Sequence, residues 1–227
     1  MENRNGFLLS TVKFGDNNAV IHVFTKEEGF QSFFLRGIYS AKNKKKAYLQ
    51  PLIELNFSVS RTGQSSLANA SRLELAENFS ADNDIKSHSI LFFVSDFLNF
   101  ALRNEGINET LYQEIKQFRQ SVLHANYTAH LVFLTKFFQY QGLAPLYNEG
   151  DFLNPEDGTF ATSLVHKTFD HEISAIWKDI LYESDGNEKK IPSNLRKKYL
   201  DSLMIYCQLH YPGFRTPVSL EVVQQIF

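Results

Sequence analysis

The feature that most constrains the fold is a change in the spacing of apolar residues near position 82. Before it, short runs with alternating apolar side chains are separated by turn residues, a pattern typical of half-buried β-strands. After it, apolar residues recur every three or four positions, which is typical of amphipathic helices. The sequence therefore predicts an α+β protein, with a β domain over residues 1–80 and an all-α C-terminal domain over residues 81–227.

Five runs rich in β-branched and aromatic residues fill the N-terminal part. Gly, Asn and Asp residues at 15–18, 27–29 and 62–64 supply turns between them. Five strands with short connections favour a small antiparallel barrel of the OB type, and closing the barrel removes exposed sheet edges. The expected strands are 6–14, 19–25, 30–36, 49–60 and 67–75.

The C-terminal part predicts six helices. Asn108 is the expected N-cap of the second helix, Ser193 or Asn194 that of the fifth, and Ser219 that of the last. The Gly-, Asn- and Asp-rich residues 147–158 are expected to form a loop. The expected helices are 90–102, the segment from Asn108 to Val122, 128–141, 169–182, 193–210 and 220–227, with a break at 185–187.

Composition points to an ordinary globular protein. Hydrophobic residues make up 43% and charged residues 21% of the 227 positions, and no signal-like start or 20-residue apolar run occurs. A single cysteine, Cys207, excludes an internal disulfide and fits a reducing compartment. We therefore expect a soluble, cytoplasmic protein. The net charge is −2, yet residues 1–80 hold ten Lys and Arg against seven Asp and Glu.

The excess of positive charge is concentrated in residues 36–46, which contain five cations and no acid between two predicted strands. Such a cluster does not form core, because burying unpaired ammonium groups is too costly. It is either a plain solvated loop or an anion-binding surface, and short Lys/Arg-rich runs are weak motifs on their own. The five cations are Arg36, Lys42, Lys44, Lys45 and Lys46.

Signatures of catalysis are missing from the sequence. It has no Gly-rich phosphate loop, no G-x-S-x-G and no H-E-x-x-H motif. His166 and His171 stand five positions apart near two acids, but this spacing does not place both rings on one helical face. We expect surface or capping roles for them, no cofactor and no metal, and a protein that is not an enzyme.

Several runs of residues resemble the RecO family of bacterial recombination mediators. The N-terminal run Gly6-Phe7-Leu8-Leu9-Ser10-Thr11-Val12 resembles the opening of that family, and Tyr211-Pro212-Gly213-Phe214-Arg215 resembles its C-terminal signature. The similarity extends in order over essentially the whole chain. The runs that carry it are 6–16, 23–29, 35–37 with the Lys residues that follow, 49–52, 134–145, 211–215 and 219–221.

The resemblance implies an OB barrel, a helical domain and a non-enzymatic role. It implies binding of single- and double-stranded DNA, annealing of complementary strands, and help in loading RecA on strands coated by the single-stranded-DNA-binding protein. The implied partners are RecR and the acidic, apolar C-terminal tail of that coating protein. It also implies a location in the bacterial cytoplasm, at the nucleoid during repair. The rival hypothesis is an adaptor whose OB barrel binds protein and not DNA.

Two departures from the family pattern stand out. Many members carry a four-cysteine zinc site after the middle helix, whereas residues 147–162 contain no cysteine, so the chain resembles the zinc-free members. The family's Arg-Gly-Ala-Arg is here Arg36-Gly37-Ile38-Tyr39, which replaces the second guanidinium with a phenol. Phosphate binding is therefore expected to depend on the lysines.

The candidate DNA-binding residues are the five cations of residues 36–46, together with Lys13 and Arg61. Tyr39 is a candidate for stacking on a base, as is one of Phe33 and Phe34.

The partner's acidic and apolar tail would need a cation beside apolar side chains. Lys136 with Phe137, or Arg215 with Phe214, could supply this. The alternative for each is a packed side chain with a cation that reaches into solvent.

Overall fold

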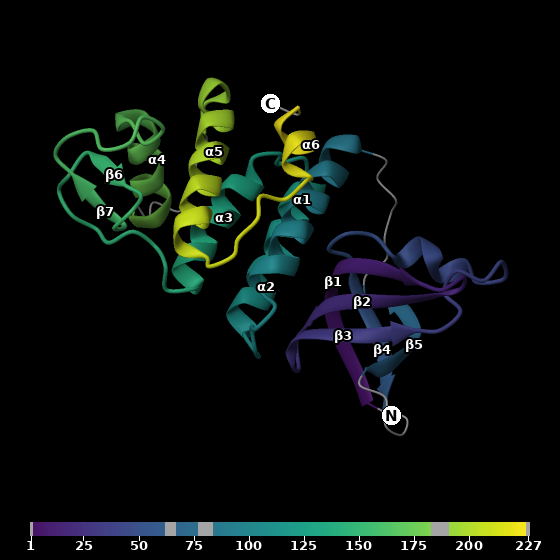
Figure 1. Ribbon diagram of the computed structural model, residues 1–227. Helices are drawn as coiled ribbons and strands as arrows, with labels where there is room; N and C mark the ends of the chain where they lie inside the picture. The colour runs from purple at the N-terminus through teal and green to yellow at the C-terminus, as the bar shows by residue number, and fades with distance from the viewer. Residues whose placement is uncertain (1, 62–66, 77–83, 183–190, 226–227) are drawn as a thin grey trace. The chain divides into compact units, whose positions relative to one another are not determined.

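The computed structural model describes residues 2–61, 67–76, 84–182 and 191–225. It divides into two compact units, Met1–Arg119 and Gln120–Phe227. In chain order the elements are β1 (Glu2–Phe14), β2 (Asn18–Thr25), β3 (Gly29–Leu35), the 3-10 helix η1 (Lys44–Tyr48), β4 (Glu54–Ser60), β5 (Ala68–Leu75), α1 (Ile85–Ala101), α2 (Glu109–Leu123), α3 (Ala129–Tyr140), β6 (Phe152–Asn154), β7 (Thr159–Ala161), α4 (His171–Tyr182), α5 (Ser193–His210) and α6 (Leu220–Gln224) (Figure 1).

The first five strands form a closed barrel in the order β1-β2-β3-β5-β4, which confirms the expected OB-type fold. Neighbouring strands are antiparallel except β3 and β5, which close the barrel in parallel. The long strand β1 pairs with β4 through its first half and with β2 along its second half. A bulge between Leu8 and Ser10 changes the register and bends the strand. Alternate side chains such as Ile21, Val23 and Phe33 fill the interior.

The fourth strand starts later than the sequence predicts. Pro51 and Leu52 form a turn, and Leu52 has a φ of 53°, which is incompatible with an extended strand. The third strand ends at Leu35 and not at Arg36. The expected turn at 62–64, the break at 185–187 and residues 82 and 83 lie outside the described residues.

The first unit continues beyond the barrel. The Ser95 hydroxyl of α1 donates a 2.7 Å hydrogen bond to the carbonyl of Leu9, at the bulge of β1. The turn before β3 meets the α1–α2 connection so closely that a Cβ on Gly29 would lie 2.2 Å from the carbonyl oxygen of Gly106. Strand β5 ends at Leu75 and α1 begins at Ile85, and the compact unit that contains the barrel extends to Arg119. The functional division into 1–80 and 81–227 stays a prediction.

A buried polar cluster joins α2 to the barrel. The carboxylate of Glu54 on β4 is 7% exposed. It accepts a 2.9 Å hydrogen bond from the Tyr112 hydroxyl and lies 3.3 Å from the Lys116 ammonium group. Because both partners lie on α2, the three residues fix this helix against the barrel wall.

The second unit is built around Trp177 of α4, which is fully buried. Its indole nitrogen donates to the hydroxyl of Ser202 on α5 at 3.0 Å, and its ring packs against Phe138 of α3. The hydroxyls of Thr135 and Tyr199 join α3 to α5 at 2.7 Å. The three helices thus share one aromatic core.

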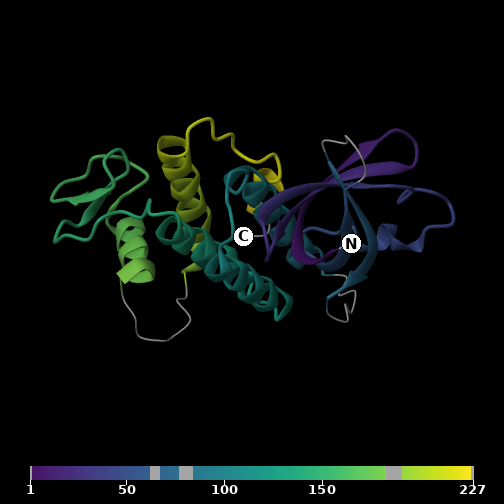
Figure 2. The same ribbon diagram turned by 90° about the horizontal axis from the view of Figure 1, so that it is seen from below.

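Residues 147–158, predicted as a loop, include the first strand of a short antiparallel hairpin of β6 and β7. Figures 1 and 2 both show this hairpin beside α4. The backbone nitrogen of Leu153 donates to the Ser174 hydroxyl of that helix at 2.8 Å. The periodicity of the sequence could not reveal strands only three residues long.

The expected helix caps have mixed outcomes. Asn108 caps α2 as predicted, because its side-chain oxygen accepts from the backbone nitrogen of Leu111 at 3.0 Å. The prediction for α5 is wrong, since Pro192 is its N-cap residue, without a side-chain cap. Ser219 precedes α6 as predicted, but its side chain makes no capping hydrogen bond. Within the described ranges, none of the helices combines the length and apolar character needed to span a bilayer.

Candidate nucleic-acid interface

The basic residues 36–46 form an ordered segment and not a loose loop. Gly37 turns the chain after β3 with a φ of 66°, and its nitrogen donates to the Asn18 side chain at 2.9 Å. The Tyr39 nitrogen donates to the carbonyl of Asn17 at 2.9 Å. Asn43 then caps η1, accepting from the backbone nitrogen of Lys45. The segment is therefore held against the β1–β2 turn.

Four of the five predicted cations point their charge at solvent. Arg36, Lys42, Lys44 and Lys46 are exposed. Across the part of the chain that the structure describes, none of them forms an ion pair with a carboxylate. Tyr39 packs on the barrel core beneath the Lys46 ammonium group, which lies 5.6 Å from its ring centroid. Whether Tyr39 stacks on a base stays a prediction.

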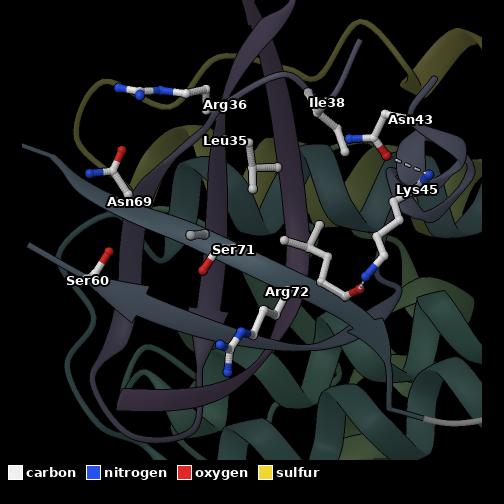
Figure 3. Close-up of a pocket in the computed structure, with 11 residues that line it drawn as sticks. Leu35, Arg36, Ile38, Asn43, Lys45, Ser60, Asn69, Ser71 and Arg72 are labelled. Atoms are coloured by element: carbon white, nitrogen blue, oxygen red, sulfur yellow. Dashed lines mark hydrogen bonds between the residues drawn. The ribbon is translucent and has the colours of Figure 1, made fainter. Parts of the chain in front are cut away.

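Lys45 is placed differently from its neighbours. It is half-buried, and its ammonium group donates a 2.6 Å hydrogen bond to the backbone carbonyl of Leu73 on β5. Figure 3 shows this side chain running down one end of a groove. Lys45 therefore attaches η1 to the barrel wall and keeps a positive charge in the groove.

This groove, called the basic groove below, is a cavity of about 380 Å³ at one side of the barrel. Among the described residues that line it, Arg36, Lys45 and Arg72 are cationic and none is acidic (Figure 3). Hydroxyl and amide groups lie between the cations. Such a lining suits a phosphate-bearing ligand, which needs positive charge and hydrogen-bond donors together. The other lining residues are Leu35, Ile38, Asn43, Ser60, Asn69, Ala70, Ser71 and Leu73.

Arg72 is the residue that sequence reasoning missed. The register of β5 against β4 shifts between Ser58 and Asn56, and Arg72 lies in this bulge with a φ of 52°. Such left-handed backbone is unfavourable for a residue with a side chain. Arg72 lines the basic groove and is exposed, and it also lines a neighbouring hollow of about 440 Å³ that contains Glu74. An arginine in a strand pattern carries no sequence signal of a bulge, so only the structure reveals it.

Lys13 and Arg61 lie outside the basic groove. Lys13 is exposed near the end of β1. Arg61 is also exposed and follows β4, where it lines a second hollow of about 890 Å³ with Arg4 and Arg103. Ser60 lines both hollows, so they adjoin each other. The second hollow contains Glu2 and Glu28, which pair with Arg4, and is thus less positive than the first.

The candidate partner residues in the second unit differ in exposure. Phe137 is fully buried and stacks on Tyr211 with ring centroids 6.3 Å apart, so it belongs to the core and offers no surface to a partner. Lys136 beside it is exposed. Phe214 is half-buried next to an exposed Arg215, so this second pair keeps apolar surface beside a cation.

The two histidines weighed as metal ligands serve local contacts. A ring nitrogen of His166 accepts from the backbone nitrogen of Thr168, and the His171 ring packs edge-on against Phe152. Over the described residues, no group of three or more His, Cys, Asp and Glu side chains is arranged to hold a metal ion.

Comparison with known proteins adds a family to this geometry. Residues 1–79 match the family model described as recombination protein O, N terminal. DNA repair protein RecO of Flavobacterium psychrophilum is 28% identical over 97% of this chain and 96% of its own length. The protein of the same name from Flavobacterium johnsoniae is 26% identical, over the same shares of the two chains. That from Phocaeicola vulgatus is 27% identical over 98% and 97%. The closed barrel thus coincides with a match to the N-terminal RecO family model, and the chain is similar over nearly its whole length to proteins named DNA repair protein RecO.

Proposed function

We propose that this protein is a non-enzymatic mediator of DNA recombination and repair that binds single- and double-stranded DNA through the basic groove. In this role it anneals complementary strands and assists the loading of RecA on strands coated by the single-stranded-DNA-binding protein. The names of its relatives support the repair role, since each is called a DNA repair protein. The chemistry of the barrel surface supports the binding of DNA.

The observation that carries the proposal is that the basic segment, residues 36–46, presents exposed cations to solvent. Arg36, Lys42, Lys44 and Lys46 are exposed, and within the described ranges no carboxylate neutralises them. Elsewhere in the same unit a surface cation, Lys26, is paired with the carboxylate of Glu109 at 3.1 Å. Unpaired cations concentrated in one short segment attract a polyanion although the chain as a whole is slightly negative.

The cations and hydrogen-bond donors of the groove suit contacts to phosphates. Phosphate contacts position a nucleic acid without carrying sequence information. An annealing protein has to accept any pair of complementary strands, so this lack of specificity fits the proposed role. With four or five phosphate contacts, the logarithm of the binding constant should fall against the logarithm of salt concentration with a slope of about −3 to −4 for a single strand.

The test compares this salt slope between variants. Replacing Lys44, Lys45 and Lys46 with alanine should flatten the slope by about 2 units. A matched control replaces Lys167 and Lys197, two exposed lysines of the second unit, and should leave the slope unchanged. An unchanged slope in the triple variant would move the DNA site elsewhere. Failure of the parent protein to bind any DNA would favour the adaptor that binds only protein.

For the partners, we propose RecR and the acidic, apolar tail of the single-stranded-DNA-binding protein. The exposed Arg215 beside the half-buried Phe214 supports a tail site, since it combines a cation with apolar surface. Phe137, the apolar residue expected beside Lys136, is fully buried and offers no surface to a tail. In fluorescence polarisation with a tail peptide, Arg215→Glu should weaken binding more than Lys136→Glu. The reverse order would place the tail on α3.

A further inference from the structure

Two phenylalanines form an exposed aromatic pair on the outside of the barrel. Phe14, at the end of β1, is 60% exposed, and Phe34 on β3 is half-buried. Their ring centroids lie 5.8 Å apart, edge to face at 80°. Phe33, by contrast, is 2% exposed and packs in the interior against Phe57. Of Phe33 and Phe34, the two phenylalanines that the sequence offered for base stacking, only Phe34 has ring surface available.

This aromatic pair lies beside the basic groove. Phe34 is the register partner of Asn69, and Asn69 lines the groove together with Arg36. The turn that follows Phe14 is fastened to the basic segment by the hydrogen bond from the Gly37 nitrogen to Asn18. Strand pairing and this hydrogen bond to the Asn18 side chain therefore hold the two rings close to the groove.

We propose that Phe14 and Phe34 are a stacking platform for the unpaired bases of a single strand whose phosphates lie in the basic groove. The platform makes the barrel prefer single strands over duplex. This inference rests on the proposed DNA-binding function and deepens it, because phosphate contacts alone do not tell the two forms apart.

The chemistry of the surface selects this occupant. A single strand presents negative phosphates and flat base faces at a spacing of one nucleotide, and proteins bind it with cations and aromatic rings side by side. A duplex keeps its base faces inside the stack, so it gains nothing from the rings. An apolar protein partner would cover the rings but leave the charges of Arg36 and Arg72 without a counterpart. The only acid between β1 and β2 is Asp16, and Lys13 on the same hairpin offsets its charge.

The experiment measures the affinity of the full chain for a mixed-sequence single strand and for the matching duplex. Phe14→Ala should weaken single-strand binding about 10-fold, which is about 1.4 kcal/mol, and change duplex binding less than 2-fold. The salt slope should stay unchanged, since no charge is removed. Phe14→Trp should keep the affinity. Val12→Ala, a control at a residue of similar exposure on the same strand, should have no effect on either.

A second readout follows the bases directly. The fluorescence of a 2-aminopurine base in the single strand should be quenched when the strand binds the parent protein. The quenching should be smaller with Phe14→Ala. Phe34→Leu keeps apolar bulk at a half-buried position, so it should fold normally and lower single-strand affinity several-fold.

Three results would overturn the platform. The first is that Phe14→Ala loses affinity equally for single strand and duplex, and the second is that it loses affinity for neither. The third is that the chain self-associates and that Phe14→Ala abolishes this association while DNA binding is kept. The proposed function fails on a different observation, namely when the parent protein binds neither form of DNA.

Discussion

The ammonium group of Lys45 is hydrogen-bonded to the backbone carbonyl of Leu73 at 2.6 Å, while Lys44 and Lys46 on either side of it are exposed. Three consecutive lysines therefore have two different roles. Lys45 holds η1 to β5, and its neighbours present charge to solvent. The sequence letters are identical, so the difference arises from the direction in which a 3-10 helix sends each side chain.

This division of roles can be measured. Lys45→Ala should lower the free energy of unfolding by about 1 kcal/mol, the typical net value of a hydrogen bond. Lys44→Ala and Lys46→Ala should each change it by less than about 0.5 kcal/mol, as is usual for surface substitutions. Urea denaturation followed by circular dichroism measures both. The double variant Lys44→Ala/Lys46→Ala should flatten the single-strand salt slope by about 1.4 units. Equal stability of all three single variants would mean that the Lys45 contact contributes nothing in solution.

Arg72 should show opposite effects on stability and on binding. Arg72→Gly removes the guanidinium and relieves the left-handed backbone at φ 52°, so the free energy of unfolding should rise by up to about 1 kcal/mol. The same change should flatten the salt slope by about 0.7 units, because one phosphate contact is lost. Arg72→Lys, the matched control, keeps the charge and should keep the slope. A loss of stability in Arg72→Gly would contradict the strain at this bulge.

Tyr112 should make the stability sensitive to alkaline pH. Burial, and then the negative charge of Glu54, raise the pKa of its hydroxyl above the ordinary value of about 10. The folded state therefore favours the protonated phenol. Its contribution is complete below about pH 10 and is lost as the pH rises further, so the free energy of unfolding should fall there. In urea titrations between pH 8 and pH 10.5, the free energy of unfolding of Tyr112→Phe should fall less steeply than that of the parent protein. Equal slopes for the variant and the parent would contradict this.

At pH 8 the free energy of unfolding of Tyr112→Phe should already be about 1–3 kcal/mol lower than that of the parent protein, because the buried carboxylate of Glu54 loses its hydroxyl donor.

Gly29 should be the least replaceable glycine of the first unit. Its φ is 73°, and an added Cβ would lie 2.2 Å from the carbonyl oxygen of Gly106. Gly29→Ala should therefore lower the free energy of unfolding by about 3 kcal/mol or more, because the backbone, and not a flexible side chain, would have to move. Gly15→Ala is the control, with a φ of 61° and nothing within 4 Å of the added carbon, and should cost about 1–2 kcal/mol. Similar losses for the two variants would show that the close approach to Gly106 relaxes easily.

Most of the fold could be read from local patterns. The alternation of apolar residues predicted the barrel strands, and Asn108 was recognisable as a cap because an N-cap depends only on residues within one turn. The hairpin of β6 and β7 was missed because three-residue strands hold too few alternations to stand out. The cap of α5 was misassigned because Ser193 and Asn194 look like caps regardless of where the backbone turns.

The candidate site divides in the same way. The sequence determined that the charge lies in residues 36–46, because a cluster of lysines has to be on the surface. Only the tertiary structure decided that Arg36, Lys45 and Arg72 share one groove, that Phe14 joins Phe34 beside it, and that Phe137 is core. The physical reason is that the periodic burial of side chains along a strand or helix depends on residues that are neighbours in the sequence. The meeting of β3 with β5, and the bulge that contains Arg72, depend instead on pairing between strands far apart in the chain.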